Sequence, residues 1–171
     1  MAHVMLYSTS QDGALYMFVT DHAVGAGCAN QRDDVLLVQF FLAALAADPL
    51  RAGTQRFNYQ SAEGLPYDYL LGDRPPLAID GVCGANTVAY IRHFQKEGSK
   101  AFPASDPLSM NIDGVITPVR KGVPWGERTG KVLSIVRLNR EYRAIYGAQR
   151  LMRIDQDPLF PRELASSFFM A

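Results

Sequence analysis

Several features that mark whole classes of protein are missing from this sequence of 171 residues. It has no net charge, because seventeen lysines and arginines balance seventeen aspartates and glutamates, while 48% of its residues are hydrophobic. Disordered chains combine low hydrophobicity with high net charge, and polybasic binders need an excess of positive charge, so both classes are excluded. A chain of about 150 residues buries roughly 70% of the surface that its unfolded form exposes. We therefore expect one domain of ordinary size, with room for a second small lobe.

Long apolar runs are missing too. The best candidate, residues 35–47, is interrupted by Gln39 and is shorter than the roughly 18 apolar residues of a membrane span. Residues 1–9 contain neither the basic nor the apolar region of a secretory signal. We expect a protein that is cytoplasmic at synthesis and that would reach the periplasm or cell wall only by a secretion or lysis route.

Cysteine is scarce, and so are the motifs of catalysis. Cys28 and Cys83 stand far apart, and two buried free thiols are a simpler interpretation than a disulfide in a chain without an export signal. His22 and His93 could join them at a metal, but no HxxH, HxxxH or CxxC spacing is present. The chain also lacks a Gly-x-Ser-x-Gly elbow, a phosphate-binding loop and an HExxH motif. We expect no metal, no cofactor and no enzymatic activity.

The pattern of apolar residues predicts a mainly α-helical chain that begins with a β-hairpin. Residues 4–19 form two apolar runs around Ser10–Gly13, and Asp12-Gly13 is a frequent turn pair. Apolar residues at three-to-four-residue spacing, together with caps and stop signals, predict three helices. These run from Gln31 to Ala47 with Asn30 as N-cap, from Thr87 as N-cap to Gly98, and from about Thr129 to Tyr146, closed by Gly147.

The segments between and after these helices carry aromatic and basic side chains. Residues 49–78 are predicted to be a long surface loop, with Tyr67 and Tyr69 either covering the core or lining a binding face. The third helix carries arginines opposite its apolar stripe, and a tail follows over residues 148–171. The arginines are Arg137, Arg140 and Arg143, and the tail contains a short amphipathic segment from Arg162 to Met170 that ends in aromatics.

An internal repeat is the most specific feature. Ile79-Asp80-Gly81-Val82, followed by Gly84-Ala85-Asn86-Thr87 and a helix, recurs as Ile112-Asp113-Gly114-Val115, followed by Gly126-Glu127-Arg128-Thr129 and a helix. Each unit combines an apolar anchor, an Asp-Gly turn, a second glycine and a threonine able to cap a helix. The distance in sequence between the two Asp-Gly pairs corresponds to the length of one supersecondary unit.

At these residues the sequence resembles the peptidoglycan-binding domain family, a small bacterial three-helix module that binds the cell wall. Residues 35–42, with Gln39, match the first helix of the family pattern. Residues 79–87 and Phe94-Gln95 match its first Asp-Gly loop and second helix, and residues 112–118 match its second Asp-Gly loop. The resemblance covers about residues 30–147 and implies a three-helix core. It also implies that peptidoglycan glycan or stem peptide binds in a groove between the Asp-Gly loops and the second helix.

The candidate site residues fall into two groups. A buried amide must be hydrogen-bonded, so the glutamines of the first two helices are predicted to hold the Asp-Gly loops, and the structural motif comprises Gln39, Gly81, Gly84, Thr87, Phe94, Gln95 and Gly114. The candidates for ligand contact are Asp80, Asn86, Tyr90, Asp113, Arg120 and Trp125. Turn formation alone would also explain the two aspartates, and the Arg120–Gly126 loop is either a ligand platform or a protein contact.

Three functions follow, in decreasing order of support. The first is a non-catalytic peptidoglycan-binding module. The second is a structural or accessory interaction component of a bacterial secretion, contractile injection or phage-like assembly, with self-association through the hairpin edge, the tail or charge polarity. Residues 1–90 hold four basic and nine acidic side chains, and residues 115–153 hold nine and two. The third, nucleic-acid binding by the arginine face, is disfavoured because such a stripe is usually a solvated face.

Overall fold

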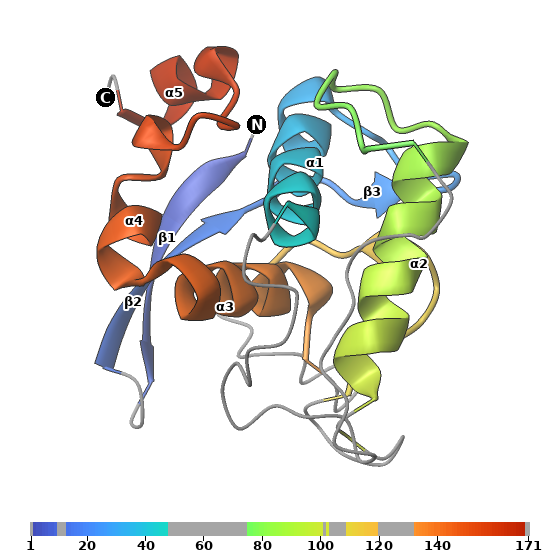
Figure 1. Cartoon of the computed structure of the whole chain (residues 1–171), viewed down its shortest axis with the longest axis horizontal. Helices are drawn as coiled ribbons and strands as arrows, with labels where there is room; N and C mark the ends of the chain where they lie inside the picture. The colour runs from blue at the N-terminus through green and yellow to red at the C-terminus, as the bar shows by residue number, and fades with distance from the viewer. Residues whose placement is uncertain are drawn as a thin grey trace.

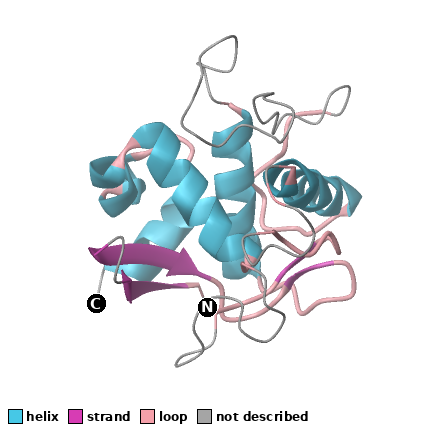
Figure 2. Ribbon diagram, turned by 90° about the horizontal axis from the view of Figure 1, so that it is seen from below, coloured by secondary structure: helices cyan, strands magenta, loops and turns pink. Residues whose placement is uncertain are grey.

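A computed structural model describes residues 2–9, 13–47, 75–100, 102, 109–119 and 132–169. The chain is a mainly helical small domain with an N-terminal antiparallel hairpin and three main helices, as predicted (Figures 1 and 2). In chain order the elements are β1 His3–Thr9, β2 Gly13–Val19, β3 Val24–Gly25, α1 Arg32–Ala46, α2 Ala85–Ser99, β4 Val115–Ile116, α3 Ser134–Tyr146, α4 Ala148–Met152, the 3-10 helix η1 Ile154–Gln156, and α5 Arg162–Phe169.

Helix α1 is the centre of the fold. Its buried residues include every position from Asp34 to Leu42, and it contacts α2, α3, α5, β2 and β3. A helix that is apolar on nearly all sides must be enclosed to be stable. Figure 1 accordingly shows α1 between α2 on one side and the hairpin and C-terminal helices on the other, with α3 crossing below.

The hairpin is fastened to α3 through a buried amide. Strands β1 and β2 pair in register from His3 opposite Val19 to Thr9 opposite Gly13, and the predicted turn residues 10–12 lie outside the described part of the chain. On the other side of β2, Asn139 of α3 accepts a hydrogen bond from Phe18 N at 2.8 Å and donates one to Phe18 O at 2.9 Å. The outer edge of β2 is therefore satisfied by α3 at this residue.

The start of α1 differs from the prediction. The N-cap position is Gln31, without a side-chain cap, and the predicted cap Asn30 has a positive φ of 49°. The Asn30 side chain instead bonds across the preceding turn, accepting from Gly25 N at 2.9 Å and donating to Gly25 O at 2.9 Å and Cys28 O at 3.1 Å. Asparagine suits both roles because it tolerates the left-handed region and bonds nearby backbone groups.

The bounds of the other two main helices are also corrected. Helix α2 begins at Ala85, so Thr87 lies within its first turn. Gly98 does not end α2 but lies inside it, where a Cβ would clash with Met110 Cε; close approach, and not termination, explains this glycine. Helix α3 begins only at Ser134, well after Thr129, which lies outside the described residues.

One arginine of α3 is not on a solvated face. The Arg137 side chain is only 4% exposed, its guanidinium pairs with Glu141 at 2.6 Å, and it lies 5.4 Å from the centre of the Phe102 ring. Arg140 and Arg143 are partly exposed. The prediction that all three arginines share one polar face is therefore wrong for Arg137, whose charge is paired with Glu141 inside the fold.

The C-terminal segment packs onto the core. Phe160 stacks edge-on against Phe40 of α1 at 5.0 Å between ring centres, and Phe168 of α5 does the same with Phe18 of β2 at 5.4 Å. Leu164 is fully buried. These side chains form one hydrophobic core together with the hairpin and the main helices, so the described part of the tail completes the fold.

A polar cluster fixes the path of this segment between α3 and α5. Asp157 is buried and accepts a hydrogen bond from the Tyr142 hydroxyl at 2.7 Å and from two guanidinium nitrogens of Arg150 at 2.9 and 3.1 Å. Burial, and then the bond to Asp157, raise the pKa of Tyr142.

Among the described residues, no helix has the length and apolarity needed to cross a membrane.

Candidate functional site

Gln39 of α1 holds the first Asp-Gly loop through its side-chain amide, which has five polar atoms within hydrogen-bond distance. Its Oε1 accepts from Asp80 N at 3.1 Å and from Gly81 N at 2.8 Å. Its Nε2 lies 2.9 Å from Asp80 Oδ1, 3.1 Å from Val82 O and 3.1 Å from Thr87 Oγ1. Because Gln39 is only 1% exposed, every one of these bonds replaces water that the amide lost on burial. The expected link between this glutamine and its loop is present.

Gln95 of α2 repeats the arrangement on the second loop. Its Oε1 accepts from Gly114 N at 2.8 Å, and the two hydrogens of its Nε2 are shared among Asp113 Oδ1 at 3.0 Å, Val115 O at 3.0 Å and Ser134 Oγ at 3.1 Å. Ser134 at the start of α3 thus takes the part that Thr87 plays in α2. We call these two arrangements the amide clamps.

Within each clamp the aspartate and glycine make the turn itself. Asp80 Oδ1 accepts from Val82 N and Asp113 Oδ1 from Val115 N, both at 2.9 Å. Gly81 and Gly114 follow, and their φ values of 74° and 77° are left-handed, where a side chain would be strained. The two aspartates therefore have local structural roles, and the loops are held rigidly between helices.

Acid should weaken the first clamp. Hydrogen bonds from Val82 N–H and then from Gln39 hold the pKa of Asp80 below its ordinary value. A carboxyl whose pKa is depressed by folding stabilises the protein above its unfolded pKa, and this contribution is lost as the pH falls through the folded pKa. We expect Asp80→Asn, which keeps an acceptor oxygen but cannot titrate, to lose less stability than wild type between pH 5 and pH 2, measured by urea unfolding. Asp155→Asn, at an exposed position, serves as the control and should follow wild type; equal acid sensitivity of all three proteins would contradict the prediction.

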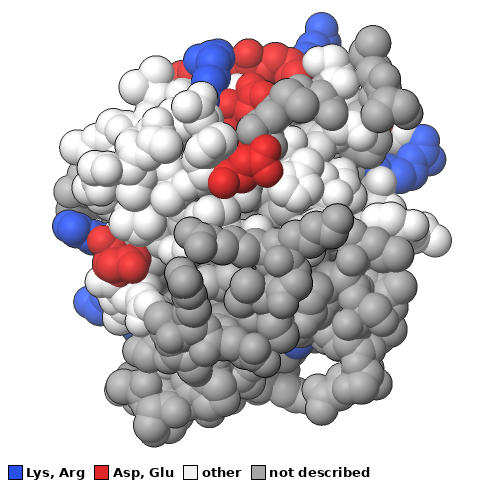
Figure 3. Space-filling view, turned by 180° about the vertical axis from the view of Figure 1, so that it is seen from behind, with Lys and Arg blue, Asp and Glu red and all other residues white. Residues whose placement is uncertain are grey.

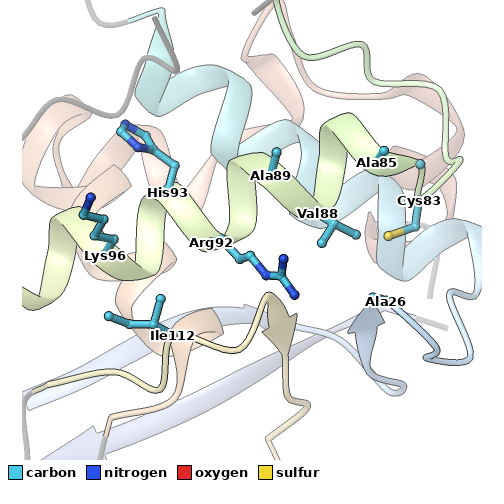
Figure 4. A pocket seen from close by; sticks show the side chains of 10 residues that line it. Ala26, Cys83, Ala85, Val88, Ala89, Arg92, His93, Lys96 and Ile112 are labelled. Atoms are coloured by element: carbon cyan, nitrogen blue, oxygen red, sulfur yellow. The ribbon is translucent and has the colours of Figure 1, made fainter.

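A groove runs between the two clamped loops and the outer face of α2 (Figure 4). Its volume is about 770 Å³. The turn after β3 and the end of the first loop form one wall, the second loop forms the other, and α2 forms the base. The lining residues are Ala26, Cys83, Gly84, Ala85, Val88, Ala89, Arg92, His93, Lys96 and Ile112.

The groove combines positive charge with apolar surface. Arg92 and Lys96 are exposed on successive turns of α2, and neither forms an ion pair with a described residue. Val88 and Ile112 supply apolar surface beside them; Ile112 is 57% exposed. Such a surface can bind an anionic group that is attached to an apolar chain.

A smaller hollow of about 420 Å³ adjoins the groove and shares Lys96 and Ile112 with it. It continues past Lys100 to Phe102 and Met110. The Lys100 ammonium is held by Glu97 of the same helix at 2.7 Å, so its charge is already balanced. Among the lining residues that the structure describes, Arg92 and Lys96 are therefore the lysine and arginine without an acidic partner in the described ranges.

The sequence-predicted ligand residues that the structure describes do not line this groove. Asp80 and Asp113 belong to the clamps, and Tyr90 is 2% exposed with its hydroxyl donating to Pro75 O at 3.3 Å. Asn86 donates to the same carbonyl at 3.5 Å, while its Oδ1 is buried without a partner among the described residues. Arg120 and Trp125, with Tyr67 and Tyr69, lie outside the described ranges. Of the predicted structural residues, Phe94 is in the core and Gly84, the N-cap of α2, lies at the groove wall.

Sequence reasoning missed the two cations that line the groove. Arg92 and Lys96 are four residues apart, and they lie opposite the buried stripe of Tyr90, Ile91 and Phe94. That spacing was visible in the sequence and indicates one exposed face. The spacing could not show that the second loop, which carries Ile112, lies beside the same face of α2.

Neither the cysteines nor the histidines form a metal site in the described part of the chain. Cys28 and Cys83 are free, as expected, but are half-buried instead of buried. Burial, and then the nearby Cys28, raise the pKa of the Cys83 thiol. In the ranges that the structure describes, no three His, Cys, Asp or Glu side chains gather in a way that could hold a metal ion.

The basic side chains do not gather into one surface on the face opposite the view of Figure 1. Figure 3 shows the described lysines and arginines of that face standing apart, with acidic side chains between them. Nucleic-acid backbones are bound by continuous positive surface, so the described residues of this face give no support to that function.

Comparison with known proteins adds no relative. No protein-family model, no curated protein and no solved structure matches the chain.

Proposed function

We propose that this protein is a non-catalytic recognition module that binds peptidoglycan in the groove between the clamped loops and α2. The observation that carries the proposal is the groove itself, whose cations Arg92 and Lys96 form no ion pair with any described residue and lie beside apolar surface. Peptidoglycan carries carboxylates on peptides that also contain methyl-bearing residues, so both properties of the groove have a counterpart in this ligand.

The amide clamps support the same function. They fix both loops that border the groove to α1, α2 and α3. A preformed site loses less conformational entropy on binding than a flexible one. The groove also lies where the sequence resemblance expects the ligand, although different side chains line it.

Sedimentation with purified sacculi tests this proposal. We expect wild type to co-sediment at low salt, and the double variant Arg92→Gln/Lys96→Gln to bind about tenfold more weakly because charge-assisted contacts are lost. Arg153→Gln, which removes an exposed arginine away from the groove, is the matched control and should bind as wild type does. Wild-type protein that remains in the supernatant would exclude the function.

A second candidate is an interaction component of a larger bacterial assembly. It is supported by the hairpin, a two-stranded sheet in which no described strand pairs with the outer edge of β1. An exposed edge can accept a strand from another chain. Light scattering over a range of concentrations tests self-pairing, and a constant monomeric mass would exclude a second copy at this edge.

A further inference from the structure

An arginine lies across the glycine of each Asp-Gly loop. Arg32, from α1, covers Gly81 so closely that a Cβ there would be 2.7 Å from Arg32 Nη1. Arg92, from α2, covers Gly114, where a Cβ would be 2.7 Å from Arg92 Nε. In both cases the arginine and the clamping glutamine belong to the same helix. Because glycine has no side chain, the arginine side chain can pack directly against the backbone of the loop.

In the first repeat the arginine holds a carboxylate. Arg32 Nη1 donates to Asp80 O at 2.6 Å, while Nη2 and Nε point at the two oxygens of Glu163, at 2.8 and 3.3 Å. This is the two-pronged geometry in which a guanidinium fork matches a carboxylate. Glu163 comes from α5, which the fold brings to this point from the far end of the chain.

In the second repeat the corresponding carboxylate is missing from the described residues. Arg92 forms no ion pair or hydrogen bond with any of them, and its side chain extends into the groove toward the second loop (Figure 4). The pair Arg32–Glu163 therefore shows, within the same molecule, which group an arginine in this setting binds.

We infer that Arg92 is the docking point for a carboxylate of the ligand, equivalent to Glu163 beside Arg32. The inference rests on the proposed function and deepens it. In peptidoglycan the free carboxylates belong to the stem peptides and not to the glycan chains, so the recognised part is the stem peptide.

Lys96 fits a second carboxylate of the same ligand. It follows Arg92 by four residues, which corresponds to about 6 Å along a helix axis. A ligand with two carboxylates that lies along α2 can therefore contact both cations, with Val88 and Ile112 supplying apolar surface beside it.

Titration of a fluorescently labelled stem tetrapeptide tests the inference. We expect the peptide with free carboxylates to bind, and the same peptide with amidated carboxylates to bind at least about tenfold more weakly. Arg92→Gln should lower affinity for the free peptide about tenfold, and Arg92→Lys should recover only part, because lysine keeps the charge but loses the fork. Arg153→Gln should change nothing, and urea unfolding of each variant verifies that the fold is retained.

The possible results separate the inference from the function on which it rests. Equal binding of free and amidated peptides, or of wild type and Arg92→Gln, would overturn the inference while sacculus binding upheld the function. Wild-type affinity of Arg92→Gln for glycan strands freed of stem peptides by an amidase would do the same, with the sugars as the ligand, whereas Arg92-dependent binding of these strands would place the carboxylate on the glycan, where the amidase exposes one, and would also overturn the assignment to the stem peptide. Failure to bind any of these materials would overturn both, as would selective Arg92-dependent binding of a single-stranded oligonucleotide, which would identify a phosphate ligand instead.

Discussion

Replacing Gln39 by alanine is expected to destabilise the protein by about 3 kcal/mol or more. The change leaves the N–H groups of Asp80 and Gly81 without their acceptor in a partly buried setting, and a buried group that loses its partner costs about 1–3 kcal/mol. It also removes the donor to the Val82 carbonyl and opens a cavity next to α1. Urea unfolding at neutral pH measures the loss.

Two further variants make this expectation specific to the clamp. Gln95→Ala should cost a similar amount, because Gln95 makes the equivalent bonds to the second loop. Gln149→Ala, an exposed glutamine at the start of α4, should change stability by less than about 0.5 kcal/mol. If the Gln39 and Gln149 variants are equally stable, the clamp contributes nothing to folding stability, and the sequence repeat needs another explanation.

The amide clamps could be predicted from the sequence because their chemistry leaves few solutions. A glutamine in the middle of an apolar helix face must find several partners, and an Asp-Gly turn offers unpaired backbone groups. The repeat presents this combination twice, with Gln39 before Asp80 and Gln95 before Asp113. The three main helices and the hairpin followed in the same way from apolar periodicity.

Residue types that occur in more than one structural role could not be assigned to one of these roles from the sequence. Asn30 has the residue type of an N-cap but bonds across a turn, and Gly98 has that of a helix terminator but gives room to Met110. In both cases the prediction from residue type was wrong, because a contact elsewhere in the fold and not the local preference decides the role. Arg92 illustrates the same limit for the site, since the second loop that faces it is distant in sequence.

The C-terminal segment was the most ambiguous part. An aromatic-ended tail suits a partner's groove and also suits the chain's own core, because the same side chains bury well in either. In the structure, α5 contacts α1 and β1, and Glu163 bonds Arg32 at the first clamp. The tail therefore supports the loop that borders one side of the groove, which joins the far end of the chain to the site.

Phe160→Ala should accordingly cost about 3–5 kcal/mol of folding stability, the usual loss for truncating a buried phenylalanine. Phe160 is 6% exposed and packs against Phe40 in the centre of α1. The neighbouring Leu159 is 41% exposed, so Leu159→Ala is a matched control and should cost less than about 1 kcal/mol. A tail that only docks on a partner would give the opposite result: Phe160→Ala would leave urea unfolding unchanged and alter the mass in light scattering. A large loss of stability at constant mass would instead show that the tail stabilises the core, and would leave the groove along α2 and the edge of β1 as the described surfaces to which the proposals assign binding.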